Sequence, residues 1–254
     1  MSIPGSRPAF AGLVALLTAC SAGAQKAQPA ADAGQAASTA DEPAQTMPNT
    51  LTAAEREAGW RLLFDGSTLD GWRGYRQEAT TGWQVVDGAI KRVEPGGDII
   101  TTEVFDDFEF SVEWKVEQGG NSGILYNVTL GQEQIYHGAP EMQVLDDANH
   151  RDGQAEITSS GSNYALHPVP RGIVRPAGEW NASRVLIHGN HVEHWLNGQK
   201  VVEYELHSDD WKRRVAESKF NDWPEYGQAT EGHIGLQDHG DPVLFRNVKI
   251  RVIQ

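Results

Sequence analysis

Apolar and polar residues alternate strictly along the segment from Asp107 to Glu117. The apolar positions of this segment are Phe108, Phe110, Val112, Trp114 and Val116. A period of two predicts a β-strand with one buried face, and no helical period fits the same residues. Shorter runs predict further strands at residues 83–86, 89–93, 99–102, 123–128, 141–145, 184–188, 191–196, 200–206, 232–237 and 243–252. Asn197-Gly198, between two of these runs, predicts a tight hairpin.

Helical patterns are few in this chain. Ser208 supplies an N-cap before two acidic residues, and Trp211 and Val215 then form an apolar stripe typical of a packing helix. A short helix is also expected within residues 51–59. Many strands, long connections and one convincing internal helix predict an all-β fold, an antiparallel two-sheet jelly-roll sandwich.

The first twenty residues have the features of an export signal. An apolar run over residues 9–19 follows Arg7 and is too short for a comfortable membrane span. Residues 17–20, Leu-Thr-Ala-Cys, resemble the bacterial lipobox, in which the cysteine becomes lipidated. The alternative is an ordinary signal with a chance cysteine. We expect residues 1–20 to be a lipoprotein signal and Cys20 the lipid anchor, with Ser21 favouring the outer membrane by analogy with other lipoproteins.

Residues 21–50 are rich in alanine, glutamine and proline and poor in large apolar side chains, which predicts a disordered tether before a domain at residues 51–254. The net charge is −14, from 35 acidic and 21 basic residues. This charge argues against nucleic acid and anionic lipid as partners, so we expect membrane contact through the anchor alone. Eight tryptophans suit either a core or flat contacts with sugar rings.

A carboxylate and an amide share one face of the strand expected at residues 141–145. Glu141 and Gln143 lie two residues apart, while Met142 and Val144 turn the other way. Such a pair can transfer a proton and position a ligand, although solvated strand faces often carry the same residues.

The loop of residues 146–153 contains acids, a histidine and a glycine, a composition that suits either a hard cation or a sugar. A polar surface loop is the alternative, because the spacing is not that of a regular calcium loop. Asn121 opens one strand, and Gln237 and His239 close another, where loop residues often carry function. The chain lacks the motifs of helix-borne zinc proteases and of serine hydrolases with a nucleophile elbow.

Several motifs resemble the bacterial 3-keto-disaccharide hydrolase domain family. They are Leu62-Leu63-Phe64-Asp65-Gly66, Leu69-Asp70-Gly71-Trp72, Gly120-Asn121-Ser122-Gly123-Ile124, Pro140-Glu141-Met142-Gln143-Val144-Leu145-Asp146, Pro176-Ala177-Gly178-Glu179-Trp180-Asn181, His191-Val192-Glu193-His194-Trp195-Leu196-Asn197-Gly198, Gly235-Leu236-Gln237-Asp238-His239-Gly240 and Phe245-Arg246-Asn247-Val248-Lys249-Ile250. The resemblance runs from about Trp60 to the C-terminus and implies a concanavalin A-like jelly roll that acts on glycosides oxidised at C3.

The implied reaction is loss of the C2 proton, departure of the C1 substituent, and return of water. The ketone acidifies the C2 proton, so one base and one group that stabilises the enolate oxygen suffice. Our hypothesis assigns the acid/base role to Glu141 and a second proton-transfer or electrophilic role to His239 or His150.

Sugar hydroxyls are expected to bind Asn121, Gln143 and Gln237. Glu113 and Lys115 share a strand face that we expect to border the same cleft. No cofactor is required by this scheme. A divalent ion could replace the electrophile, with Asp146 and His150 as its first candidate ligands.

Three functional readings stay open at this point. The first is an enzyme that cleaves 3-keto-glycosides, with an oxidoreductase as the functional partner that makes the ketone. The second is a non-catalytic carbohydrate-binding lipoprotein, because this fold also hosts lectins. The third, a conventional retaining glycosidase, is disfavoured because Gln143 stands where a paired-carboxylate strand would carry a second acid.

Overall fold

The computed structural model describes residues 47–253, so the expected signal, the expected lipidation site Cys20 and the expected tether up to residue 46 lie outside the described residues. An eight-stranded sheet runs in the order β11 (Gln199–Glu205), β10 (His191–Leu196), β9 (Asn181–His188), β6 (Phe108–Val116), β13 (Val243–Val252), β4 (Ala89–Arg92) and β3 (Trp83–Val86), and β1 (Arg61–Leu62) pairs with β13. A five-stranded sheet runs β2 (Trp72–Gly74), β5 (Ile99–Thr101), β12 (His233–Leu236), β7 (Asn121–Val128) and β8 (Glu141–Leu145).

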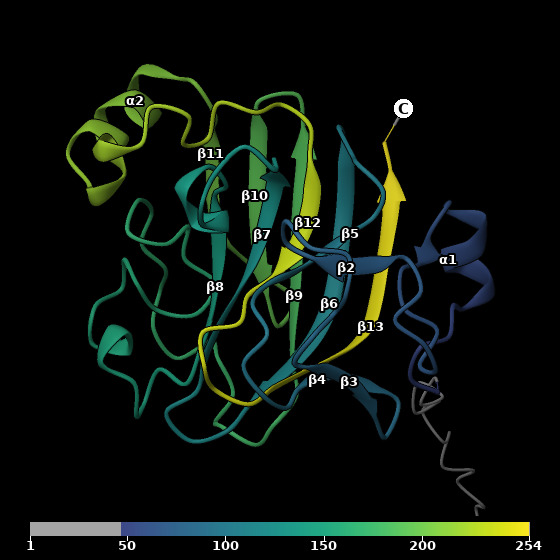
Figure 1. Cartoon of the computed structure of the whole chain (residues 1–254). Helices are drawn as coiled ribbons and strands as arrows, with labels where there is room; N and C mark the ends of the chain where they lie inside the picture. Colours follow the sequence, from purple (N-terminus) through teal and green to yellow (C-terminus); the bar gives the residue numbers. More distant parts are fainter. Residues whose placement is uncertain (1–46, 254) are drawn as a thin grey trace, which may run out of the picture. The chain divides into compact units, whose positions relative to one another are not determined.

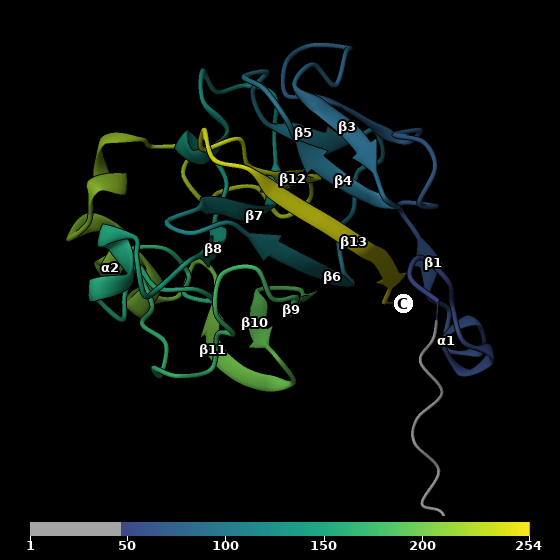
Figure 2. The ribbon, with the colours of Figure 1, turned by 90° about the horizontal axis from the view of Figure 1, so that it is seen from below.

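The two sheets lie face to face, as two views at right angles show (Figures 1 and 2). All their strand pairs are antiparallel. The helices are α1 (Ala53–Glu57), α2 (Asp209–Ala216) and the 3-10 turns η1 (Ile135–His137), η2 (Arg151–Gln154) and η3 (Lys219–Asp222). The antiparallel two-sheet jelly-roll prediction is confirmed. Within residues 47–253, no helix has the length and apolar character needed to cross a membrane.

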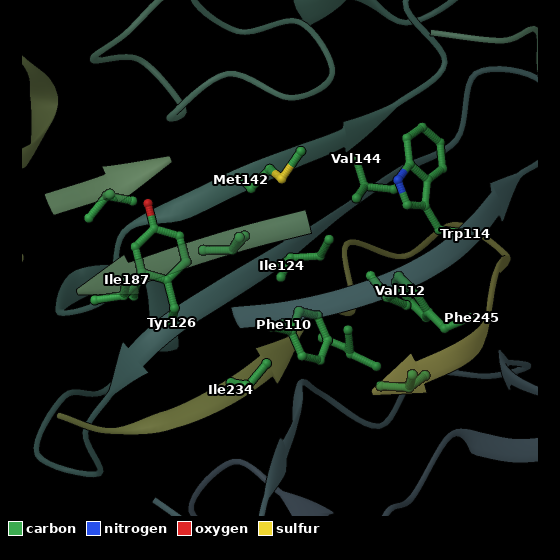
Figure 3. Packing of buried hydrophobic residues seen from close by; sticks show 14 of the residues in the cluster. Phe110, Val112, Trp114, Ile124, Tyr126, Met142, Val144, Ile187, Ile234 and Phe245 are labelled. Carbon is green, nitrogen blue, oxygen red and sulfur yellow. The ribbon is translucent and has the colours of Figure 1, made fainter. Parts of the chain in front are cut away.

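The core lies between the sheets and follows the predicted alternation. Every apolar side chain on the inward face of β6 is buried, and Ile124, Tyr126, Met142 and Val144 of β7 and β8 pack opposite (Figure 3). Burying one large apolar side chain stabilises the fold by about 1.5–3 kcal/mol. Trp114 is fully buried and donates its indole N–H to Ser183 Oγ at 2.8 Å. The inward face is therefore committed to packing, which leaves the outward faces for chemistry.

The tight hairpin forms as predicted. Asn197 and Gly198 have φ angles of 49° and 81°, the left-handed values that a type I′ turn requires, and they join β10 to β11. Ser208 caps α2 by accepting the backbone N–H of Trp211. The strands β1 and β2 escaped the sequence analysis because two or three residues are too few to display a period of two.

Asn49 belongs to the folded domain, although the sequence analysis placed it in the tether. It is 9% exposed, donates its side-chain amide to Gly88 O at 2.7 Å, and accepts the Asn247 backbone N–H at 2.8 Å. The domain thus begins before the expected boundary at residue 51.

The outward face of the five-stranded sheet is covered at one end. Ile100 and Leu125 form a second apolar cluster there with Ile135 and Ala139, which lie in and just after η1. Farther along β7 and β8 the same face carries polar residues, and α2 lies beside β8 and β11 at one edge of the sandwich (Figures 1 and 2). The polar part of this face, between η1, η2 and η3, is where side chains can contact a ligand.

Candidate active site

A pocket of about 240 Å³ opens on the outward face of β7 and β8. Its lining residues are Asn121, Tyr136, Glu141, Gln143, Arg151, Asp152, Tyr164, Lys219, Phe220, Gln237 and His239. Strands β7 and β8 supply the floor, and η1, η2, η3 and the loop after β12 supply the walls. Sites that enclose drug-sized ligands usually measure roughly 300–1,000 Å³, so this volume suits a single sugar ring.

Glu141, the first residue of β8, lies at the base of the pocket. Met142 and Val144 take the core positions, so the alternation of the strand turns Glu141 outward. The partner strand makes room for it, because a Cβ atom at Gly123 would lie only 2.8 Å from Glu141 Cδ. Glu141 is 7% exposed, and no hydrogen bond from the described residues contributes to its pKa.

Burial raises the pKa of Glu141 to about 8. Lys219 lowers the pKa, while the carboxylates of Asp98 and Asp152 raise it. The carboxyl is therefore neutral below this pH and ionises close to the physiological range. This tuning is typical of a catalytic acid or base.

Lys219 brings a positive charge to the same pocket from η3. Its Nζ lies 4.4 Å from the centroid of the Tyr164 ring, and the Tyr164 hydroxyl donates to Asp152 Oδ2 at 3.1 Å. Desolvation lowers the pKa of Lys219, whereas Glu141 and Asp152 raise it. An ammonium group held on an aromatic face beside Glu141 can stabilise an anion that forms on a bound ligand.

Three amide side chains line the pocket beside the acid, as the sequence analysis expected. Asn121 is 2% exposed, and its Oδ1 has no hydrogen-bond partner within residues 47–253. The Oε1 atom of Gln143 accepts a hydrogen bond from the Val144 backbone N–H at 3.0 Å. The amide nitrogen of Gln143 therefore points away from this bond. Gln237 completes the set at the end of β12. Amides can both donate and accept, so they suit the hydroxyls of a sugar.

The two candidate histidines lie side by side but differ in access to the pocket. His239 lines it, whereas His150 packs edge-on against His239 with 6.3 Å between ring centroids. His150 Nδ1 accepts the Asp152 backbone N–H at 3.1 Å and so caps η2. Of the two candidate histidines, His239 is therefore the one that lines the pocket, while His150 packs against it.

The expected metal ligands do not converge on a site. Asp146 accepts hydrogen bonds from the Gly119 N–H and the Asn149 side-chain amide, both at 2.7 Å, which ties it to the surrounding loops. In the described part of the chain, the side chains whose ligand atoms do converge are His191, Glu193 and Glu203. Those two carboxylates already hold the ammonium of Lys200.

Glu113 and Lys115 lie away from the pocket, contrary to the expectation that they border it. Both project from the outward face of β6, in the other sheet, where Glu113 pairs with Arg246 at 2.7 Å. The Nζ of Lys115 lies 4.9 Å from the centroid of the Trp180 ring. The alternation of the strand correctly predicts that Glu113 and Lys115 share a face. It carries no information on which of the two sheets bears the site.

Sequence reasoning missed several wall residues. Tyr136, Tyr164, Lys219 and Phe220 come from connections that show no strand or helix period. Arg151 and Asp152 lay within the loop that its composition had singled out as a sugar or cation site. For Arg151 and Asp152 the clue was loop composition, whereas Gln237 and His239 were predicted from their position at the end of a strand.

The fold and the site together define a class of protein. The protein is a two-sheet sandwich whose polar pocket has the size of one sugar ring and contains three amides and a protonated carboxyl. Such a site is suited to binding a sugar and to transferring a proton to or from it.

Comparison with known proteins agrees with this class. Residues 59–251 match the 3-keto-alpha-glucoside-1,2-lyase-like domain, and the chain belongs to that family. A curated 3-keto-disaccharide hydrolase from Bacteroides thetaiotaomicron is 36% identical over 267 residues, covering 89% of this chain and 92% of the relative.

Solved structures add the fold. One from Parabacteroides distasonis, described as a "putative glycosyl hydrolase", is 36% identical with a TM-score of 0.77 and covers 82% of this chain and 100% of its own. A second structure of the same description and source is 26% identical with a TM-score of 0.60, covering 76% and 99%. The family resemblance expected from the motifs is confirmed, and an enzyme that acts on glycosides is supported.

Proposed function

We propose that this protein cleaves glycosides whose sugar ring carries a ketone at C3, by removal of the C2 proton and loss of the C1 substituent. The observation that carries the proposal is Glu141, a buried carboxyl without a hydrogen-bond partner among residues 47–253 and with a pKa of about 8, at the base of a ring-sized pocket. The family and the curated relative support the same chemistry.

Glu141 acts on the proton at C2. In its ionised form it takes this proton, and the electrons of the C–H bond form an enolate with the C3 carbonyl oxygen. The ammonium of Lys219 stabilises that negative charge. A pKa near the working pH suits this step, because an appreciable fraction of the base is ionised while it remains a strong acceptor.

Departure of the C1 substituent completes the elimination. The C1–O bond breaks as the enolate re-forms the ketone and a double bond joins C1 to C2. The leaving oxygen takes a proton, for which His239 is the donor we propose. Water then adds at C1 and gives its proton to His239, which restores the donor. Glu141, after its proton has exchanged with solvent, returns a proton to C2, which gives the 3-keto sugar and regenerates the carboxylate.

The pocket amides orient the ring for these steps. Asn121, Gln143 and Gln237 bind the hydroxyl groups, and Asn121 Oδ1, which has no partner within residues 47–253, can accept a hydrogen bond from one of them. The partner enzyme implied by this scheme is an oxidoreductase that introduces the ketone.

The test is turnover of a 3-keto-glucoside compared with its unoxidised parent by the protein. We expect release of the alcohol from the keto form alone, with incorporation of solvent deuterium at C2. Binding of both sugars without release from either would support the non-catalytic lectin instead. Release from the unoxidised parent would support a conventional glycosidase.

We further propose that the protein is exported and held by a lipid on Cys20, with the outer membrane favoured by Ser21. The support is the sequence at residues 17–20. Replacement Cys20→Ala should move the protein from the membrane pellet to the soluble fraction of lysed cells. Retention of this variant in the pellet would show that another feature holds it there.

A further inference from the structure

A second hollow of about 230 Å³ lies beside the proposed active site, at α2 and η3. Seven of its eleven lining residues are apolar or aromatic, among them Trp211, Val215, Phe220 and Trp223. The mechanism proposed above uses none of its walls. An apolar hollow of this size accommodates one ring.

The two hollows adjoin through an aromatic wall. Phe220 lines both of them. Tyr136 of the catalytic pocket lies edge-on to Trp223 of the second hollow, with 6.0 Å between ring centroids, and Phe220 lies 6.0 Å from Trp223. By contrast, a larger hollow of about 500 Å³ beside Asp146 shares no lining residue with the catalytic pocket.

Glu141 is placed at the end of the catalytic pocket that meets this wall. It is the first residue of β8 and pairs with Leu125, whose cluster includes Ile135 of the turn that carries Tyr136. Gln143 lies two residues, about 7 Å, farther along the strand. The carbon that loses its proton is bonded to the carbon that loses its substituent. The leaving group is therefore attached close to Glu141, and the pocket itself holds one ring.

Trp223 is already oriented to receive a ring. One face stacks on His137, with 4.2 Å between centroids and 19° between planes, and the residue is half-buried. A side chain fixed in this way loses little conformational entropy when a ligand packs on it.

We propose that the second hollow binds the leaving group, and that the preferred substrates carry an apolar ring, such as a benzyl or naphthylmethyl group, as the C1 substituent. The inference rests on the proposed function for its chemistry, but binding in the hollow is measurable without turnover.

The test uses a series of 3-keto-glucosides with methyl, benzyl and 2-naphthylmethyl leaving groups, whose parent alcohols differ little in acidity. We expect kcat/KM to rise about tenfold or more from methyl to naphthylmethyl, in line with burial of an apolar aromatic group. Trp223→Ala should remove this gain and leave methyl turnover within twofold. Ala216→Trp, at an exposed position on the wall of the hollow, should do the same by filling it.

Trp180→Ala is the matched control, because it removes a half-buried tryptophan beside Arg246, on the opposite sheet. This variant should keep the full gain. Calorimetry with unoxidised methyl and naphthylmethyl glucosides gives a second readout: tighter binding of the naphthylmethyl compound, lost in Trp223→Ala and in Ala216→Trp.

Three results would overturn the inference. The first is an equal kcat/KM, or an equal affinity, for all leaving groups of the series. The second is a gain in kcat/KM that survives both Trp223→Ala and Ala216→Trp. The third is an equal gain for a 3-keto-disaccharide, which would make the occupant of the hollow a second sugar. If no keto-glycoside is turned over, the proposed function fails, and calorimetry still decides whether the hollow binds the ring.

Discussion

Two glutamates on outward strand faces have opposite surroundings in this molecule. Glu109, on β6 of the larger sheet, is 2% exposed and forms ion pairs with both Arg184 and Arg251. Glu141, on β8 of the smaller sheet, is 7% exposed, and no ion pair within residues 47–253 reaches its carboxylate. The one positive charge that contributes to its pKa among residues 47–253 is that of Lys219, which lowers it.

The difference separates a structural acid from a functional one. The guanidinium groups of Arg184 and Arg251 compensate the desolvation of Glu109. Its carboxylate therefore stays ionised although the side chain is buried. Within residues 47–253 no ion pair compensates the burial of Glu141, which holds a proton up to a pH of about 8. A buried group that is left unpaired while a pocket opens above it is a candidate for chemistry, since evolution toward stability alone would pair or remove it.

The largest expected effect comes from Glu141→Gln. This variant keeps the shape and removes the base, so kcat/KM on a 3-keto-glucoside should fall by about 10³-fold or more. Full activity would end the proposed role of Glu141.

The same variant tests the burial of the acid through stability. The folded-state pKa of Glu141 lies above its ordinary value of 4.5, so its favourable contribution is complete below pH 4.5 and is lost as the pH rises through about 8. The glutamine cannot ionise and avoids this loss. The free energy of unfolding of Glu141→Gln relative to the native protein should therefore increase between pH 5 and pH 9, by up to about 4 kcal/mol, and the difference in Tm should increase with it. A difference in Tm that is constant with pH would contradict the raised pKa.

Gly123→Ala should have the next largest effect, because its Cβ atom would displace the Glu141 carboxylate. We expect about a 10–100-fold loss of kcat/KM, since misplacement by about 1 Å can cost 10²-fold. Gly131→Ala is the control: nothing lies within 4 Å of a Cβ atom there. Equal activities of the two variants would mean that the carboxylate position is not critical.

Lys219→Met should change the pH dependence of kcat/KM and leave the fold intact. In the native protein kcat/KM should rise with pH and level off above about 8, as Glu141 ionises. Because Lys219 lowers that pKa, its removal should move the midpoint to higher pH and reduce activity at pH 7 by about tenfold. Lys91→Met, on β4 of the other sheet, should leave the midpoint in place. An unchanged midpoint in Lys219→Met would remove Lys219 from the environment of Glu141.

The sequence predicted the strands far better than the walls of the site. Alternation along β6 and the Asn197-Gly198 turn are local signals, and both elements form as expected. Glu141 and Gln143 could be placed on one face for the same reason. The contribution of Lys219 could not be foreseen, because the chain that carries it reaches β8 only through the packing of α2 and η3.

The smallest effect is expected from Glu113→Gln. This variant tests whether the outward face of the larger sheet is structural rather than functional. Glu113 and Glu141 both occupy outward positions beside a polar partner two residues on, so strand pattern alone gave both a place near the ligand. Glu113 is partly exposed and paired with Arg246, so loss of the pair should cost about 1 kcal/mol or less in chemical denaturation. Its activity should stay within twofold of the native protein. A tenfold loss of kcat/KM without loss of stability would show that the outward face of the larger sheet takes part in the reaction, and the division between a structural and a functional face would then be wrong.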